Sequence, residues 1–161
     1  MNDNPKRICW ETSCFSARFN EEPGRVDVCK SIIEAAKKGD VELYTSFITV
    51  CEWAKIKSEY ASEAEDTIAE FLRNPYIRLV AIDWSISRIT RDLVRRYDLD
   101  VRNAIHLATA IKLKVDVFHS YDTDLLNLNG KIPEVKVVIC EPVFTFQTSM
   151  DKTPDSEVKQ E

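Results

Sequence analysis

The 161-residue sequence lacks a long apolar run, because no stretch approaches the roughly 20 apolar residues that a membrane helix needs. Its first residues, MNDNPKR, have no apolar segment behind their charges, so we expect no secretion signal and a cytoplasmic location. Internal repeats and a linker that would split the body are also absent. With 44% hydrophobic and 30% charged residues, the composition indicates one globular domain with a sizeable core.

Paired cysteine motifs are missing as well. The chain has five cysteines, an odd number without a C-x-x-C pair, at Cys9, Cys14, Cys29, Cys51 and Cys140. This pattern indicates neither a zinc site nor a disulfide framework. We expect these residues to be small, buried hydrophobic side chains in a reducing compartment rather than catalytic thiols.

An excess of positive charge is the third absence. The 22 basic residues are outnumbered by 27 acidic ones, which gives a net charge of −5 and argues against coating of nucleic acid by bulk electrostatics. Five arginines nevertheless lie within fifteen residues, at positions 88, 91, 95, 96 and 102. They indicate either a local phosphate contact or a solvated helix face, and the sequence leaves both interpretations open.

Strand-like and helix-like segments alternate along the chain. Short apolar runs predict strands at 7–10, 41–46, 77–82, 116–119 and 135–139. Apolar residues at three- and four-residue spacing predict helices at 26–38, 48–59, 61–72, from a cap at Asp83 or Ser85 to Tyr97, and at 101–114. We therefore predict an α/β fold, a three-layer α/β/α sandwich with a central parallel sheet, over residues 1–144. Residues 145–161 are polar and aperiodic, which predicts a disordered tail.

Polar residues stand where these strands end and these helices begin. They are Glu11 after the first strand, Glu52 on the helix after the second, Asn103 at the start of the helix 101–114, and Asp122 after the fourth strand. The carboxyl ends of parallel strands meet at one edge of a sheet, where ligands bind, so we expect the four side chains to share one pocket. Oxygen-rich ligand sets suit Mg²⁺ or Mn²⁺ rather than zinc. Such an ion activates water and neutralises charge on a reacting phosphate.

Four segments carry a resemblance to a known family: ICWETSCF at 8–15, TSFITVCEW at 45–53, VRNAIHLATA at 101–110 and FHSYDTDLL at 118–126. Through them, residues 7–143 resemble the PIN-domain nucleases and, within these, the VapC-type ribonuclease toxins of prokaryotic toxin–antitoxin pairs. The resemblance implies a parallel sheet of order 3-2-1-4-5, an acidic pocket for Mg²⁺ or Mn²⁺, and endonucleolytic cleavage of RNA. It also implies a homodimer and an antitoxin whose tail plugs the pocket.

Two positions depart from the family pattern. Glu11 and Asn103 stand where the pattern has aspartates. Glutamate keeps the charge on a longer side chain, whereas asparagine keeps only a carbonyl oxygen and cannot act as a base. Two hypotheses follow: a metal-dependent ribonuclease toxin, or a weakened or inactive PIN-like module that binds RNA or protein.

Under the ribonuclease hypothesis, Glu11, Asn103 and Asp122 bind the metal, while Glu52 orients or deprotonates the attacking water. The expected supporting residues are Thr12, Ser13, Ser120 and Asp124. Their hydroxyls equally suit helix caps and turns, and we expect Asp124 to cap the turn at 122–126 rather than replace the missing charge.

Histidine and exposed apolar residues add two further expectations. His106 lies one turn after Asn103 on the same helix face, and we expect it to be packed and bonded to the backbone rather than to serve as a ligand or base. The two helices between Ile48 and Leu72 are the expected dimer face.

Overall fold

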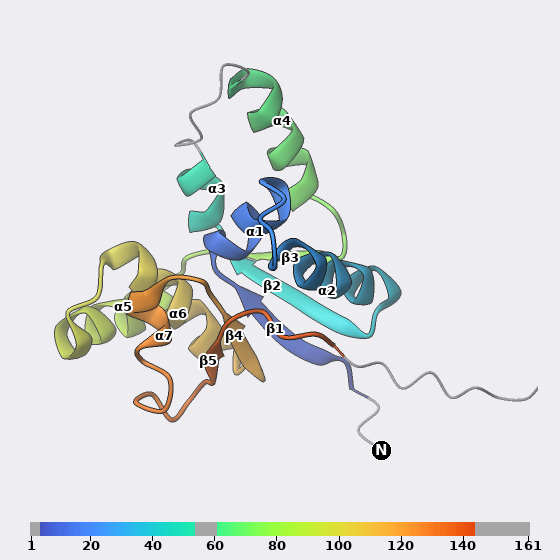
Figure 1. The fold of residues 1–161 in the computed structure, drawn as a ribbon. Helices are drawn as coiled ribbons and strands as arrows, with labels where there is room; N and C mark the ends of the chain where they lie inside the picture. Colours follow the sequence, from blue (N-terminus) through green and yellow to red (C-terminus); the bar gives the residue numbers. More distant parts are fainter. Residues whose placement is uncertain (1–3, 54–60, 144–161) are drawn as a thin grey trace, which may run out of the picture.

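The protein folds around a five-stranded sheet in which every strand pair is parallel and the order is β3-β2-β1-β4-β5 (Figure 1). The structure, a computed structural model, describes residues 4–53 and 61–143, with the side chains of 61–66 excepted. The elements are β1 (Lys6–Trp10), α1 (Thr12–Phe19), α2 (Val26–Lys38), β2 (Val41–Ser46), α3 (Ile48–Glu52), α4 (Ala61–Leu72), β3 (Ile77–Val80), α5 (Trp84–Tyr97), α6 (Val101–Leu113), β4 (Val117–His119), α7 (Thr123–Leu126) and β5 (Val137–Val138). The predicted fold class and the strand order that the resemblance implied are both confirmed.

Helices cover both faces of the sheet and form two separate apolar cores. Ile8 and Trp10 of β1 face a core built with α1, α2 and α4, whereas Cys9 between them faces a core built with α5, α6 and α7. This alternation follows from the two-residue period of a strand. The central strand is therefore buried on both faces, as in other covered parallel sheets.

Local sequence signals explain where several helices begin and end. The carboxylate of Asp83 accepts a hydrogen bond of 2.8 Å from the backbone of Ile86, which caps the start of α5 as predicted. At the end of α2, Gly39 adopts a left-handed conformation with φ of 84°, where a side chain would be strained. Helix α6 lies close to the sheet because Ala104 and Ala108 are fully buried on its inner face.

Strand ends and short helices are where the structure departs from prediction. β3 stops at Val80 instead of 82, and β5 spans only Val137–Val138 instead of 135–139. Ile82 and Ile139 are exposed by 40% and 52%, so apolar character alone did not mark the ends of the hydrogen-bonded ladder. Helices α1 and α7 had no predicted range because each is short.

Several predictions concern residues that the structure describes only in part. The helix predicted at 48–59 is confirmed as α3 up to Glu52, while its positions 54–59 lie outside the described residues. The predicted tail at 145–161 also lies outside them. Within the described ranges, no helix has the length and apolar character needed to cross a lipid bilayer.

The cysteines are all unpaired thiols, and four of them are buried as expected. Cys51 is the exception, because its side chain on α3 is exposed. Cys140 is buried beyond the end of β5 rather than within a strand.

Candidate active site

The candidate site lies where the carboxyl ends of β1 and β4 meet. Strand β1 lies between β2 and β4 in the sheet. The strand order therefore reverses its direction at β1: β2 and β3 follow on one side, and β4 and β5 on the other. The backbone of Glu11, just after β1, donates a hydrogen bond of 3.1 Å to the carbonyl of His119 at the end of β4. This is the crevice in which open α/β sheets bind ligands.

Two serine hydroxyls hold the Glu11 carboxylate. The side chain of Glu11 is buried, with 6% exposure, and its Oε2 accepts hydrogen bonds from Ser13 and, at 2.9 Å, from Ser120. Each hydroxyl is itself oriented by a backbone donor, Ser13 by the N–H of Tyr121 and Ser120 by the N–H of Asp122. Both serines thus point their protons at one carboxylate oxygen and fix its position.

A second carboxylate, that of Glu52 at the end of α3, is held by Thr12 and His106. Its Oε2 accepts hydrogen bonds from the Thr12 hydroxyl and, at 2.7 Å, from His106 Nε2. Burial alone would raise the pKa of Glu52, but these hydrogen bonds and the charge of Arg102 outweigh burial and lower it. Glu52 therefore remains ionised at neutral pH although only 15% of its side chain is exposed.

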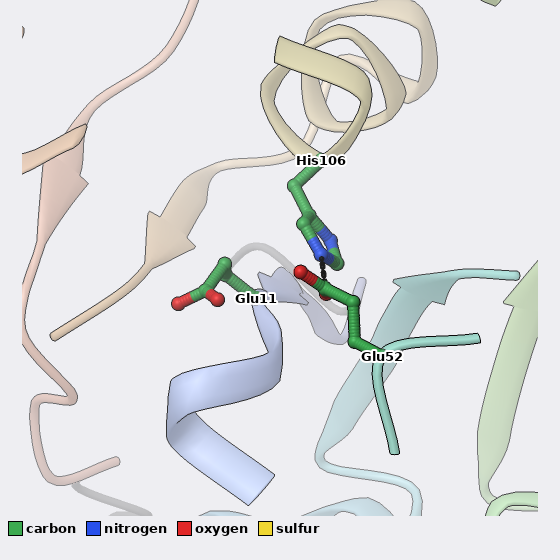
Figure 2. A group of neighbouring side chains, drawn as sticks. All are labelled: Glu11, Glu52 and His106. Atoms are coloured by element: carbon green, nitrogen blue, oxygen red, sulfur yellow. Dashed lines mark hydrogen bonds and ion pairs between the residues drawn. The ribbon is translucent and has the colours of Figure 1, made fainter. Parts of the chain in front are cut away.

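The two carboxylates and the imidazole form one cluster. Each of Glu11, Glu52 and His106 offers a ligand atom within 4.8 Å of the others (Figure 2). They come from the β1–α1 junction, α3 and α6, three segments far apart in the sequence. A donor set of this kind fits a divalent cation.

The tautomer of His106 decides which atoms suit the cation. His106 is fully buried, and its Nδ1 has no hydrogen-bond partner among the described residues. With the proton on Nε2, the ring donates to Glu52 and only an acceptor nitrogen stays unpaired. A metal on Nε2 would move the proton to Nδ1, which has no partner in the part of the chain that the structure describes, although metal-bound histidines normally donate that proton to a neighbour. The geometry therefore favours oxygen ligands, with His106 positioning Glu52.

The other two predicted ligands, Asn103 and Asp122, lie on segments adjacent to this cluster. Asn103 is half-buried in the first turn of α6, one turn before His106 and on the same face of the helix. Asp122 is joined to Glu11 through Ser120, but its carboxylate lies outside the cluster of atoms within 4.8 Å. Its Oδ1 instead accepts from the backbone of Asp124 at 2.8 Å and caps α7.

Three details of the sequence interpretation need correction. Asp122, not Asp124, caps the turn at 122–126, and Asp124 contributes its backbone N–H while its side chain is exposed. The hydroxyls of Thr12 and Ser13, which also suited helix caps, instead bind the carboxylates of Glu52 and Glu11. His106 is packed as expected, but its Nε2 bonds to Glu52 rather than to the backbone. In the sequence, the three-residue spacing between Asn103 and His106 was the signal that His106 could face the same pocket.

A family model described as PIN domain matches residues 8–131. The chain belongs to the PIN domain family. A search of curated protein sequences gives no match.

Solved structures share the fold of this PIN domain. A toxin–antitoxin complex from Klebsiella pneumoniae is similar with a TM-score of 0.60 and 20% identity, over 84% of this chain and 99% of that one. VapBC2 from Rickettsia felis, bound to a DNA fragment from its promoter, is similar with a TM-score of 0.61 and 14% identity, over 81% of this chain and 96% of that one. VapC20 from Mycobacterium tuberculosis, a toxin that cleaves the sarcin-ricin loop, is similar with a TM-score of 0.62 and 17% identity, over 80% of this chain and 98% of that one.

Proposed function

We propose that the protein is a Mg²⁺- or Mn²⁺-dependent endoribonuclease and the toxin of a type II toxin–antitoxin pair. The observation that carries this proposal is the pairing of Glu11 with Glu52 at the carboxyl edge of a PIN-domain sheet. Both carboxylates are fixed by donors, which is how a site is prepared before its ligand arrives.

Glu11, Asn103 and Asp122 are the proposed metal ligands, directly or through water. A divalent ion bound there would supply a Lewis acid that activates water and neutralises charge on the phosphate. The buried carboxylate of Glu11, close to that of Glu52, suits this task. Asn103 adds a neutral oxygen only, so we expect the affinity for metal to be modest.

Glu52 is the proposed partner of the attacking water. Because its lowered pKa makes it a weak base, it suits orienting the water and accepting its proton late in the reaction. Attack of the water oxygen on phosphorus forms one P–O bond and breaks the bond to the 3′ oxygen. The leaving oxygen takes a proton from solvent, so the products are a 5′-phosphate and a 3′-hydroxyl.

A cleavage assay tests this function directly. We expect wild type to cut RNA with Mn²⁺ present, EDTA to stop the reaction, and Asp122→Asn to abolish it. Asparagine is also a good cap, so α7 should persist in this variant. Asp40→Asn is the matched control, since Asp40 precedes β2 at the opposite edge of the sheet. Cleavage that survives EDTA or Asp122→Asn would refute the proposal.

The second candidate function is a PIN-like module that binds RNA or protein without cleaving it. The loss of a carboxylate at Asn103 is the specific observation that favours it. Under this alternative, RNA or a protein partner would still bind to Asp122→Asn in the presence of chelator, and wild type would not cut.

The proposed partners are the RNA substrate, a cognate antitoxin and a second copy of this chain, all in the cytoplasm. Two similar structures are a toxin–antitoxin complex and VapBC2 bound to promoter DNA, which supports an antitoxin here. A neighbouring reading frame that encodes a small protein with a DNA-binding N-terminus and a basic or aromatic tail would identify that antitoxin.

A further inference from the structure

Helix α5 presents a basic face that the proposed chemistry does not use. Trp84, Arg88, Arg91 and Arg95 follow one another at four-, three- and four-residue spacing, which places them along one face of the helix. All four are exposed, and Trp84 has 76% of its surface accessible. We refer to these four residues as the α5 basic face.

The opposite side of α5 accounts for the packing of this helix. Ile86, Thr90 and Leu93 are buried there. On the outer side, the side chains of Arg88, Arg91 and Arg95 border an open hollow on the surface. The α5 basic face is thus presented to solvent and is not part of the core.

The three arginines of the α5 basic face share their surface hollow with one acidic residue, Asp92. None of them forms an ion pair with any residue that the structure describes, whereas the neighbouring Arg96 is bonded to Asp92 at 3.1 Å. Like charges three and four residues apart destabilise a helix slightly. Arg95 in the last turn is favoured by the helix dipole, but Arg88 and Arg91 lie earlier in the helix and gain no such stabilisation. These charges stand out on a chain with a net charge of −5.

Helix α5 is a neighbour of the helix that carries part of the candidate active site. Helix α5 packs along α6, whose first turns carry Asn103 and His106 (Figure 1). Arg102 is exposed at the start of α6. Its hydrogen bond with Asp100, and then the nearby charges of Glu52 and Asp122, raise its pKa. Arg102 therefore places a further positive charge near the acidic crevice, on the helix next to α5.

We propose that the α5 basic face is a docking surface for single-stranded RNA, with the arginines on its phosphates and Trp84 stacked on a base. The proposal rests on the ribonuclease function and adds where the strand is held outside the crevice. Guanidinium groups bind phosphate oxygens through paired hydrogen bonds. An accessible indole stacks on any base, and its combination with a basic track is typical of single-strand binding.

The distribution of charge favours RNA over a second copy of this chain. From Trp84 to Arg95 the helix rises by roughly 16 Å, so the arginines meet a line of repeated negative charge. A copy of the same face would bring like charges together. An acidic peptide would satisfy the arginines but has no base for Trp84, and it is an outcome that the test distinguishes.

RNA binding can be measured without cleavage. Fluorescence anisotropy of a labelled, unstructured RNA in EDTA gives the affinity of wild type and of a variant with Arg88, Arg91 and Arg95 changed to Gln. The matched control changes Arg73, Lys112 and Lys114 to Gln. This control removes the same charge from exposed residues near the amino edge of the sheet.

We expect the α5 variant to bind RNA about tenfold more weakly and the control to bind like wild type. For single strands, each phosphate contact contributes about 0.7 to the slope of the logarithm of the binding constant against the logarithm of the salt concentration. Loss of three contacts should therefore make this slope shallower by about 2. Trp84→Ala should weaken binding about tenfold at an unchanged slope. Quenching of tryptophan fluorescence by RNA should vanish in Trp84→Phe, since Trp10 and Trp53 are buried.

Unchanged affinity and slope in the α5 variant would overturn the docking surface. So would a Trp84→Ala variant that changes the oligomeric state, or an α5 variant that loses only an acidic protein partner. The proposed nuclease fails separately: wild type that binds RNA through this face yet never cuts with Mn²⁺ refutes the chemistry alone. Cleavage with an unchanged KM in the α5 variant refutes the docking surface alone.

Discussion

Buried side chains at the carboxyl edge of the sheet respond to burial in opposite ways. Glu52 keeps its charge because His106 and Thr12 donate to it. His119 at the end of β4 loses its charge: burial, and then the nearby Lys6 and Lys136, lower its pKa to about 3. Its Nδ1 accepts a hydrogen bond of 3.2 Å from Trp10 Nε1, which requires an unprotonated nitrogen. His119 is therefore a structural residue that joins β1 to β4.

The neutral state of His119 makes stability depend on pH. Its folded pKa lies below the unfolded value of about 6.5, so between the two values the unfolded chain binds the extra proton and stability falls as pH drops. The loss should approach about 1.4 kcal/mol per pH unit below 6.5, or about 2 kcal/mol at pH 5. Urea unfolding of wild type and His119→Gln at pH 7 and pH 5 measures it.

His119→Gln can still accept from Trp10 but does not titrate, so its stability should change little between these two pH values. An equal acid dependence in both proteins would contradict the assignment of a neutral, structural histidine.

For single residues, the sequence indicated which side chains belong to the site more readily than which side chains they contact. Glu11 and Glu52 were predicted to share a pocket, and the structure brings them together. The engagement of Glu52 by His106 was not predicted, because helix periodicity gives the face of a side chain but not its partner on another element. The cap formed by Asp122 was likewise assigned to Asp124, two residues away.

Among the helices, α5 is the one on which the docking surface depends, and its start is fixed by a single side chain. Asp83 adopts an extended conformation and accepts from Ile86 N. Loss of this cap would expose unsatisfied N–H groups next to Trp84.

We expect Asp83→Ala to lower the free energy of unfolding by about 1 kcal/mol. Asp83→Ser, which keeps a capping oxygen, should retain most of that stability. Chemical denaturation followed by circular dichroism measures both variants. Equal stability of Asp83→Ala and wild type would show that the cap contributes nothing to α5.

The predicted bounds were most accurate for elements that end at a clear sequence signal, such as a glycine after a helix. Helix α2 and strand β2 were placed to the residue because Gly39 ends the helix and an apolar run follows it. β5 was overextended because Ile139 is apolar yet exposed. Only pairing with β4, which itself has three residues, determines where β5 ends.

For the molecule as a whole, periodicity gave the layers but not the strand order. Alternation of strands and helices predicts a covered parallel sheet for many orders. The order β3-β2-β1-β4-β5 followed only from the resemblance of four short segments to PIN domains. This order is what carries Glu11 and Asp122 to neighbouring strand ends.

The proposed homodimer remains a prediction about the assembled molecule. Phe47 and Val50, beside and within α3, are exposed by 46% and 40%, which suits the dimer face expected on the helices between Ile48 and Leu72. We expect light scattering to report twice the mass of one chain for wild type and one chain for a Phe47→Ser, Val50→Ser double variant, because apolar burial would be lost. A monomeric wild type would refute the dimer.

The central claim, that this oxygen-lined crevice holds a divalent ion which promotes RNA cleavage, is tested most directly by restoring the missing carboxylate at position 103. The measurement is the single-turnover rate of RNA cleavage as a function of Mn²⁺ concentration for wild type and Asn103→Asp. We predict that Asn103→Asp reaches half its maximal rate at a lower Mn²⁺ concentration and cleaves faster, because a charged ligand replaces a neutral one. Equal inertness of both proteins at millimolar Mn²⁺ would contradict the account.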